Sequence, residues 1–379
     1  MARLIVIGDF VWDGTISRGG HTMFMLEWLH GLERLGHEVL SLDLVRSDFQ
    51  EQRERVSHAF GEVIEKWWHA NLTSLMVGST LDSLYGLDAP AISRFAEESA
   101  ALILVGVPAS REPFPLTEKV RPRILIDQDP VYTQSWVTTG DPLDIFGDQD
   151  FYFTVGGNIG SPRCSVPTFG IDWRPIWNPI VLDWWWPQQE TTNDRFTTVA
   201  DWYTQGYITF GDRLLGPKVE EFRKFLELPR LLGEEIEVVL TINPDDPDIG
   251  KLTSLGWRIR HPDTVRTPEM YREYVRNSRG EFSCAKGGYE ATRCGWFSDR
   301  SQAYLAAGRP VILQSTGFED LLPTGQGLFA FTTMEEVVEA IRAVLADYPL
   351  HSAAARQIAL EHFDSDKILR RLFTDAGLA

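Results

Sequence analysis

The sequence predicts an α/β protein of two doubly wound domains. Its 379 residues are more than one compact core usually spans. In both halves, short apolar runs alternate with segments of helical period, which is typical of parallel sheets flanked by helices. Between residues 173 and 190 this alternation fails and tryptophans mix with prolines, which indicates a linker between the domains.

The first half begins with an apolar strand at residues 4–8 and continues through a Gly19-Gly20 turn. The helix after this turn carries apolar residues on one face and ends at Gly36, because glycine commonly terminates a helix. Further buried strands are predicted at residues 39–40, 101–106 and 124–126. Residues 48–98 have a mostly helical pattern, so we expect helices and insertions there.

The second half repeats this architecture. Strands are predicted at residues 196–200, 236–241, 257–259, 281–284 and 310–313. Helix starts are predicted at Pro217, Thr267, Ser298 and Thr333. Thr333 begins a capping box that ends at Glu336, and the last helices lie near residues 353–372.

The charge and the cysteine content exclude several classes of protein. Lys and Arg number 36 against 54 Asp and Glu, so the formal charge is −18, which disfavours nucleic acids and anionic membranes as partners. No apolar stretch is long enough for a membrane span, and no secretory leader precedes the first strand. The three cysteines include no Cys-x-x-Cys pair, so we predict no metal site. We therefore expect a cytoplasmic protein.

Two motifs lie where the first strand leads into the first helix. Gly20 and His21 open this helix at the carboxyl edge of the predicted sheet, where open α/β domains bind ligands. Gly36-His37-Glu38-Val39 follows at its end. This pair of motifs resembles the N-terminal half of GT-B glycosyltransferases, especially plant-type and natural-product members of glycosyltransferase family 1. The resemblance implies that His21 is the base that deprotonates the acceptor; the other interpretation is an ordinary helix-start residue.

A second segment resembles the donor-binding half of the same enzymes. The polar start at Ser298 offers free backbone N–H groups to a diphosphate, and the helix leads into Ala307-Gly308-Arg309-Pro310-Val311. In the family, such a helix lies at the diphosphate of a nucleotide sugar. The predicted donor-binding residues are Gly20, Trp202, Lys218, Lys286, Arg293, Ser298, Asp299, Arg300, Ser301, Gln314, Thr316 and Gly317. Arg293 replaces the usual family 1 histidine, and Ala303 lies where many GT-B enzymes place a ribose-binding glutamate, so UDP, dTDP and GDP remain open.

Two further groups of residues complete the predicted site. Asp127 and Asp129 follow a buried strand, and we predict that one of them orients His21 and stabilises its imidazolium. The other interpretation of this Asp-x-Asp pair is a metal–diphosphate site, as in GT-A transferases. Trp136 and Trp173 are predicted to stack on the acceptor.

The resemblance implies a glycosyltransferase with a GT-B fold, in which two Rossmann-like domains face a cleft. Residues 1–180 would bind a small-molecule or glycan acceptor, and residues 181–355 would bind a nucleotide-diphosphate sugar as co-substrate, without another cofactor. Helices in 356–379 would pack back on the first domain. Transfer would be metal-independent, and it would be inverting if His21 is the base and retaining if it is not. The alternatives are a nucleotide-sugar epimerase of the same fold and a non-catalytic sugar-binding protein.

Overall fold

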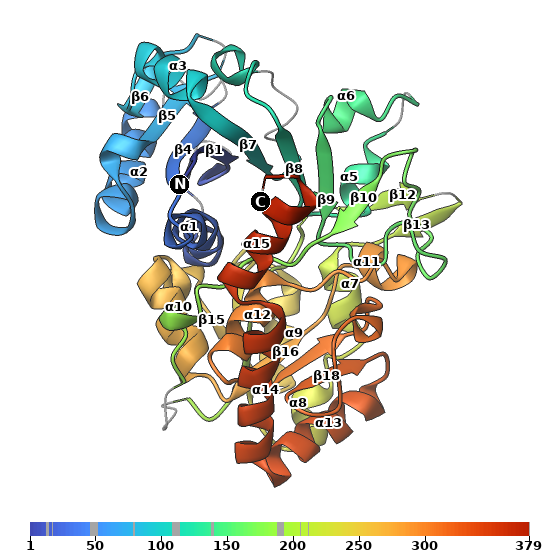
Figure 1. Cartoon of the computed structure of the whole chain (residues 1–379). Helices are drawn as coiled ribbons and strands as arrows, with labels where there is room; N and C mark the ends of the chain where they lie inside the picture. Colours follow the sequence, from blue (N-terminus) through green and yellow to red (C-terminus); the bar gives the residue numbers. More distant parts are fainter. Residues whose placement is uncertain are drawn as a thin grey trace.

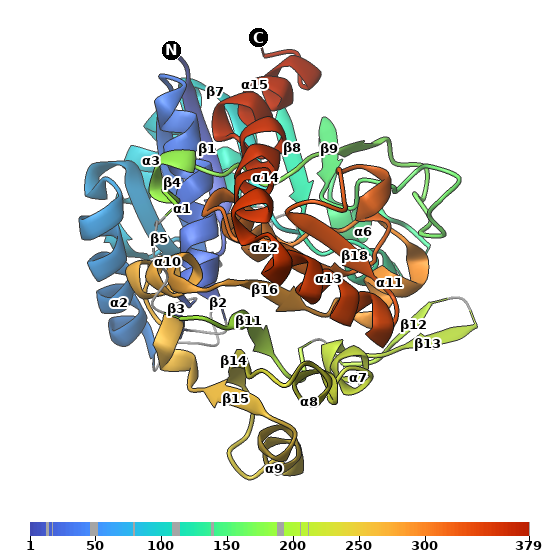
Figure 2. The same ribbon diagram turned by 90° about the horizontal axis from the view of Figure 1, so that it is seen from below.

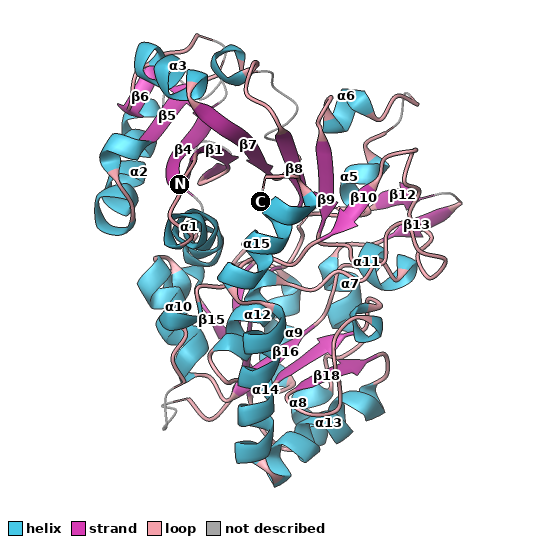
Figure 3. Cartoon of the chain, viewed as in Figure 1, coloured by secondary structure: helices cyan, strands magenta, loops and turns pink. Residues whose placement is uncertain are grey.

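Two parallel-sheet domains make up the protein (Figure 1). The structure, a computed structural model, describes residues 1–378 except 13–14, 17, 46–51, 79, 108–113, 138–139, 188–192, 205 and 211. Helices cover the faces of each sheet (Figure 3), which is the doubly wound arrangement that the sequence predicts. Within the described ranges, every helix is too short or too polar to cross a bilayer.

The first domain is built on an eight-stranded sheet with the order β10-β9-β8-β7-β1-β4-β5-β6. Its strands are β1 (Arg3–Gly8), β4 (Glu38–Val45), β5 (Thr73–Val77), β6 (Ser83–Gly86), β7 (Ser99–Val105), β8 (Arg123–Asp127), β9 (Phe151–Thr154) and β10 (Trp173–Pro175). Neighbours pair in parallel, except that β6 is antiparallel to β5. The hairpin β2 (Val11–Trp12)–β3 (Thr15–Ile16) and the helices α1 (Gly19–Arg34), α2 (Arg53–Trp67), α3 (Ala89–Glu97), α5 (Tyr132–Ser135) and α6 (Leu143–Phe146) belong to the same half of the chain.

Two predictions for this half are wrong. Gly19 and Gly20 are the first two residues of α1, so the predicted turn before the helix is wrong, whereas the prediction that Gly20 and His21 open the helix is confirmed. The stretch 48–98, predicted to be mostly helical, contains β5 and β6 between α2 and α3. All five residues of β5 are buried, so this strand lacks the polar–apolar alternation that marks a half-exposed strand.

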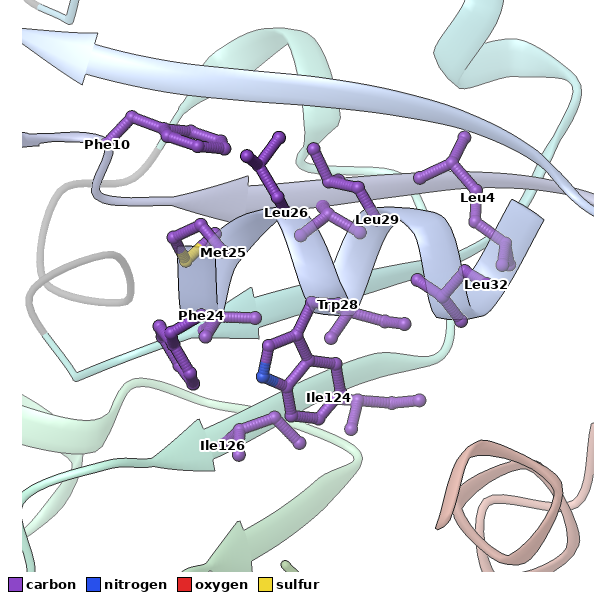
Figure 4. Close-up of a cluster of buried hydrophobic side chains, with 14 of the residues drawn as sticks. Leu4, Phe10, Phe24, Met25, Leu26, Trp28, Leu29, Leu32, Ile124 and Ile126 are labelled. Carbon is purple, nitrogen blue, oxygen red and sulfur yellow. The ribbon is translucent and has the colours of Figure 1, made fainter. Parts of the chain in front are cut away.

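Helix α1 packs on the sheet through the apolar face that its sequence predicts (Figure 4). Met25, Trp28, Leu29 and Leu32 are fully buried. Each such side chain contributes about 1.5–3 kcal/mol when it leaves water. This packing fixes the N-terminal turn of α1, which carries His21, near the carboxyl end of β1.

The second domain contains a six-stranded parallel sheet with the order β15-β14-β11-β16-β17-β18. Its strands are β11 (Phe196–Asp201), β14 (Ile236–Thr241), β15 (Trp257–Arg260), β16 (Gly280–Ser283), β17 (Val311–Gln314) and β18 (Leu328–Phe331). Its helices are α7 (Lys218–Arg223), α8 (Leu228–Leu232), α9 (Pro247–Ser254), α10 (Pro268–Asn277), α11 (Gly287–Thr292), α12 (Asp299–Ala306), α13 (Met334–Ala346) and α14 (Tyr348–His362), and a hairpin joins β12 (Ile208–Phe210) to β13 (Arg213–Leu215). The capping box at Thr333 is confirmed.

Two segments connect the domains side by side. The Ile180 N–H donates to the carbonyl oxygen of Phe363 at 2.8 Å, and the Ser365 N–H donates back to the Ile180 oxygen at 2.9 Å. Helix α15 (Ser365–Asp375) then packs against α1 through Ile368, Leu369 and Leu372 (Figure 2). The predicted return of the C-terminal helix to the first domain is therefore confirmed.

The carboxyl edges of the two sheets oppose each other. The guanidinium of Arg18, just before α1, donates a hydrogen bond to the carboxylate of Asp201, the last residue of β11, at 3.3 Å. Asp129, just after β8, pairs with Lys286, which follows β16, at 2.9 Å. Since ligands of open α/β sheets bind at carboxyl edges, both domains present their binding edges to one shared region.

Gly19 allows α1 to approach the second domain closely, and we expect Gly19→Ala to weaken this contact. A Cβ at Gly19 would lie 2.2 Å from the carbonyl oxygen of Thr267 and 2.6 Å from that of Val265. Because the clash is with backbone, we expect a loss of about 1–3 kcal/mol in the free energy of unfolding, measured in urea. Gly250→Ala is the control, since its Cβ meets nothing within 4 Å and alanine favours helix α9. Equal stability of the two variants would contradict the close contact between α1 and the backbone of residues 265–267.

Candidate active site

His21 lies in the first turn of α1, at the boundary between the domains. Its Nε2 is 2.7 Å from Oδ1 of Asp9 and 3.1 Å from the Asp9 carbonyl oxygen. Asp9 directly follows β1, so the end of the strand and the start of the helix bring the pair together. The side chain of His21 is 41% exposed. These contacts leave Nδ1 as the ring nitrogen that a substrate hydroxyl could meet.

The environment of His21 makes its imidazole unusually basic. Burial opposes the imidazolium, but the charge of Asp9, the hydrogen bond to Asp9 and the charge of Asp299 outweigh it and raise the pKa of His21 to about 9. Behind Asp9, Asp43 is 1% exposed, and burial and the charge of Asp9 raise the pKa of Asp43 to about 7. His21 therefore carries a proton at neutral pH and is the positively charged member of a cluster with Asp9, Asp43 and Asp299.

The carboxylate that contacts His21 is Asp9, so the prediction that Asp127 or Asp129 orients the imidazole is wrong. Asp127 is fully buried at the end of β8, where it accepts a hydrogen bond from the Thr133 hydroxyl at 3.0 Å. Burial raises the pKa of Asp127 to about 6, although its hydrogen bonds oppose this shift. Asp127 thus has a structural role: its carboxylate holds the segment after β8 at the carboxyl edge of the first sheet.

Asp129 engages the second domain. It pairs with the Lys286 ammonium at 2.9 Å and accepts a hydrogen bond from the Tyr289 hydroxyl. The same ammonium lies 4.7 Å from the ring centre of Tyr132 and 5.4 Å from that of Tyr289. Lys286 was predicted to bind the donor; in this structure its charge bridges the two domains.

Lys218 is a buried cation of the second domain, and the described residues supply no ion-pair partner for it. It is the first residue of α7 and is 8% exposed. Burial, followed by the charges of Arg300 and Lys286, lowers the pKa of Lys218 to about 7. A buried amine next to two cations is a strong position for an anionic ligand, because the anion would compensate the charge. The donor-binding role predicted for Lys218 stays a prediction.

Arg300, also predicted to bind the donor, is fully engaged by its own domain. It pairs with Glu281, which is fully buried, and donates to the Val199 carbonyl oxygen at 3.0 Å and the Ser283 hydroxyl at 2.8 Å. These contacts turn the guanidinium toward protein groups, and the donor-binding role predicted for Arg300 stays a prediction. Its guanidinium contributes positive potential beside Lys218.

The start of α12 faces His21 but is acidic. Ser298 is the N-cap, as predicted, although its side chain makes no capping hydrogen bond. Asp299 is the first helical residue, and its charge acts on His21. Ser298 and Ser301 are 3% and 0% exposed, so protein covers both side chains. Arg300, the next residue, pairs with Glu281 and does not add an unpaired positive charge at this helix start.

The turns around β17 hold four other predicted donor residues. Gln314 is buried and donates to Glu221 at 2.6 Å. Thr316 is buried, and its hydroxyl donates to the carbonyl oxygen of Trp296 at 2.5 Å. Gly317 is buried. Arg293 lies at the surface, where its guanidinium forms an ion pair with Glu319 at 3.1 Å. The structure thus brings Arg293, Thr316 and Gly317 together but turns their polar groups toward protein.

The tryptophans separate into two groups. Trp173 packs on Phe146 and is 7% exposed, and Trp202 is 1% exposed and donates to Asp248 at 2.9 Å. The predicted acceptor stacking of Trp173 and the predicted donor contact of Trp202 are wrong, because both rings lie in hydrophobic cores. Trp136 is half-buried at the end of α5, so its acceptor role stays a prediction. Gly20, which lies against Tyr271 of α10 at the domain boundary, also stays a prediction.

Asp9 and Glu281 are site residues that the sequence reasoning missed. Asp9 carried a usable signal, since it directly follows the first strand at the same carboxyl edge that singled out His21. Glu281 lies inside β16, where an acidic residue in an apolar run indicates a buried partner.

Comparison with solved structures identifies the fold. The chain is similar over 99% of its length and the whole length of the other chain to sucrose-phosphate synthase from Thermosynechococcus elongatus, with a TM-score of 0.61 and 12% identity. It is similar over both full lengths to HepE from Anabaena in complex with UDP-glucose, with a TM-score of 0.62 and 11% identity. A candidate UDP-N-acetylglucosamine 2-epimerase from Listeria monocytogenes matches 98% of the chain and 95% of its own, with a TM-score of 0.51 and 11% identity.

Neither protein-family models nor curated protein sequences match the chain. The structural similarity over the full length, together with two opposed parallel sheets and a returning C-terminal helix, shows that this chain has the GT-B fold.

Proposed function

We propose that the protein is a glycosyltransferase that moves a sugar from a nucleotide-diphosphate sugar to a small-molecule or glycan acceptor. The observation that carries this proposal is the pairing of two half-sites on opposed sheet edges. The first domain presents His21 with Asp9, and the second presents Lys218, for which the described residues supply no ion-pair partner, beside Arg300. HepE, of similar fold, was solved with UDP-glucose, which makes a UDP-sugar the first donor to test.

The charges suit the two partners of such a reaction. Breaking the bond at the anomeric carbon leaves a nucleoside diphosphate, and Lys218 would compensate its growing charge without a metal. His21 in its neutral form would accept the proton of the acceptor hydroxyl at Nδ1, and Asp9 would stabilise the resulting imidazolium. Direct displacement with this base inverts the anomeric centre. We place the reaction in the cytoplasm.

Ligand binding and product analysis test this function. A thermal-shift panel of UDP, GDP, dTDP and ADP should show one nucleotide that stabilises the protein by about 2–3 kcal/mol at a hundredfold excess over Kd. Incubation with the matching nucleotide sugar and an acceptor library should release nucleoside diphosphate. An altered sugar nucleotide formed without acceptor would instead favour an epimerase, and binding without turnover would favour a non-catalytic sugar-binding protein.

Donor affinity should fall as the pH rises above neutrality. Since the pKa of Lys218 is about 7, the free protein loses this positive charge between pH 7 and 8.5. The diphosphate must then bind with uptake of a proton, so the Kd for UDP-glucose should rise about tenfold between pH 7 and 8.5. Isothermal titration calorimetry in two buffers measures both the Kd and the proton uptake. Lys218→Met should bind weakly at both pH values, and a flat wild-type profile would contradict the role of Lys218.

A further inference from the structure

Asn158 reaches from the first domain into the second. It follows β9 and is 2% exposed. Its side-chain Nδ2 donates to the carbonyl oxygens of Arg293 at 3.1 Å and Gly317 at 3.0 Å, and its backbone N–H donates to the Cys294 carbonyl oxygen at 2.9 Å. An amide NH2 has two donor hydrogens, so both are used, and all three acceptors belong to the other domain.

The backbone that receives these hydrogen bonds has an unusual conformation. Arg293, Gly295 and Gly317 have φ values of 50°, 79° and 91°, in the left-handed region that side chains rarely adopt. A Cβ at Gly317 would lie 2.7 Å from Asn158 Nδ2, and a Cβ at Gly295 would lie 2.9 Å from the Asn158 backbone nitrogen. Both glycines are therefore required where the two turns close around Asn158. Conformations of this kind persist only when their surroundings hold them.

The two turns also hold each other. The Gly295 N–H donates to the Thr316 carbonyl oxygen at 2.7 Å, and the Thr316 hydroxyl donates to the Trp296 carbonyl oxygen at 2.5 Å. One turn leads directly into Ser298 and α12, and the other directly follows β17. Both turns thus lie at the carboxyl edge of the second sheet, where the donor would bind.

We infer that Asn158 is a positioning residue for donor binding, which sets the 293–296 and 316–317 turns of the second domain from the first domain. This inference rests on the proposed function. It makes the shape of the donor site depend on a residue of the acceptor-binding domain. A donor would meet turns that are already formed, so it would not have to order them on binding.

The test uses Asn158→Asp in the full chain. The side chain keeps its size, but an oxygen replaces the NH2 group and faces two carbonyl oxygens, so the turns should loosen. We expect the Kd for UDP-glucose to rise at least tenfold and hydrogen exchange to accelerate in residues 292–297 and 315–318. Asn277→Asp is the matched control, because its amide also donates to a carbonyl oxygen, that of Glu273 at 2.8 Å, at the far end of α10.

A second variant reaches the same turns without changing Asn158. Gly317→Ala places a methyl group against Nδ2 and should reproduce both effects if Asn158→Asp does not fold. Unchanged Kd and unchanged exchange in a folded variant, with only a lower Tm, would overturn the inference. A wild-type protein that binds no nucleotide would refute the proposed function instead, and the exchange rates would still decide whether Asn158 holds the turns.

Discussion

Replacing Asp9 by Asn should lower the pKa of His21 from about 9 to 6.5 or below, a change of about 300-fold in proton affinity. The charge of Asp9 and its side-chain hydrogen bond are the main influences that raise this pKa, so in the variant burial is opposed only by the charge of Asp299 and by the backbone carbonyl of residue 9. The titration is measured directly by NMR on protein with 15N-labelled histidine. Asp299→Asn is the control and should shift the pKa in the same direction by less, since Asp299 acts through its charge alone.

The same variant should change the pH dependence of turnover. At saturating donor the diphosphate keeps Lys218 charged, so kcat of the wild type should rise about tenfold per pH unit until it levels near pH 9, where His21 is neutral. Asp9→Asn should move this limb to about pH 6.5 and reduce the plateau on the order of 10²-fold, because the base is weaker and its cation is no longer stabilised. A limb that stays near pH 9 in the variant would show that another group is the base.

The fold was predictable where each element has its own signal. The apolar face of α1, the capping box at Thr333 and the parallel strands follow from local periodicity and capping chemistry. Strand β5 was missed because all of its residues are buried, so no alternation marks it. Periodicity reports which face of an element is buried and carries little information when every face is buried.

The site was predictable only as far as the carboxyl-edge rule reaches. This rule locates His21, but Asp9 follows β1 and Asp127 is the last residue of β8, and sequence alone does not tell which one lies beside α1. The sequence also does not tell which carboxylate compensates a given cation, since this depends on tertiary contacts. Arg300 lies at the expected helix start, yet Glu281 from another element determines where its guanidinium points.

The buried ion pair of Arg300 and Glu281 should be among the most sensitive places in the second domain. Glu281→Gln leaves the guanidinium without a countercharge, and we expect a loss of about 3–5 kcal/mol in the free energy of unfolding in urea. Glu235→Gln is the matched control: its ion pair with Arg195 is exposed and should cost about 1 kcal/mol or less. The double variant Glu281→Gln/Arg300→Met should lose less than the sum of the single variants, because no buried charge is left unpaired.

Donor binding should report on the same pair, because the pair also acts on Lys218. The charge of Glu281 raises the pKa of Lys218, and burial and the charge of Arg300 lower it, so Glu281→Gln should move this pKa further below its ordinary value. At pH 7.5 fewer molecules then carry the ammonium, and the Kd for UDP-glucose should rise. The double variant also lacks Arg300, so part of this loss should be recovered. Equal Kd values for UDP-glucose in the single and double variants would show that the Arg300–Glu281 pair affects stability alone. Other neighbours would then set the pKa of Lys218.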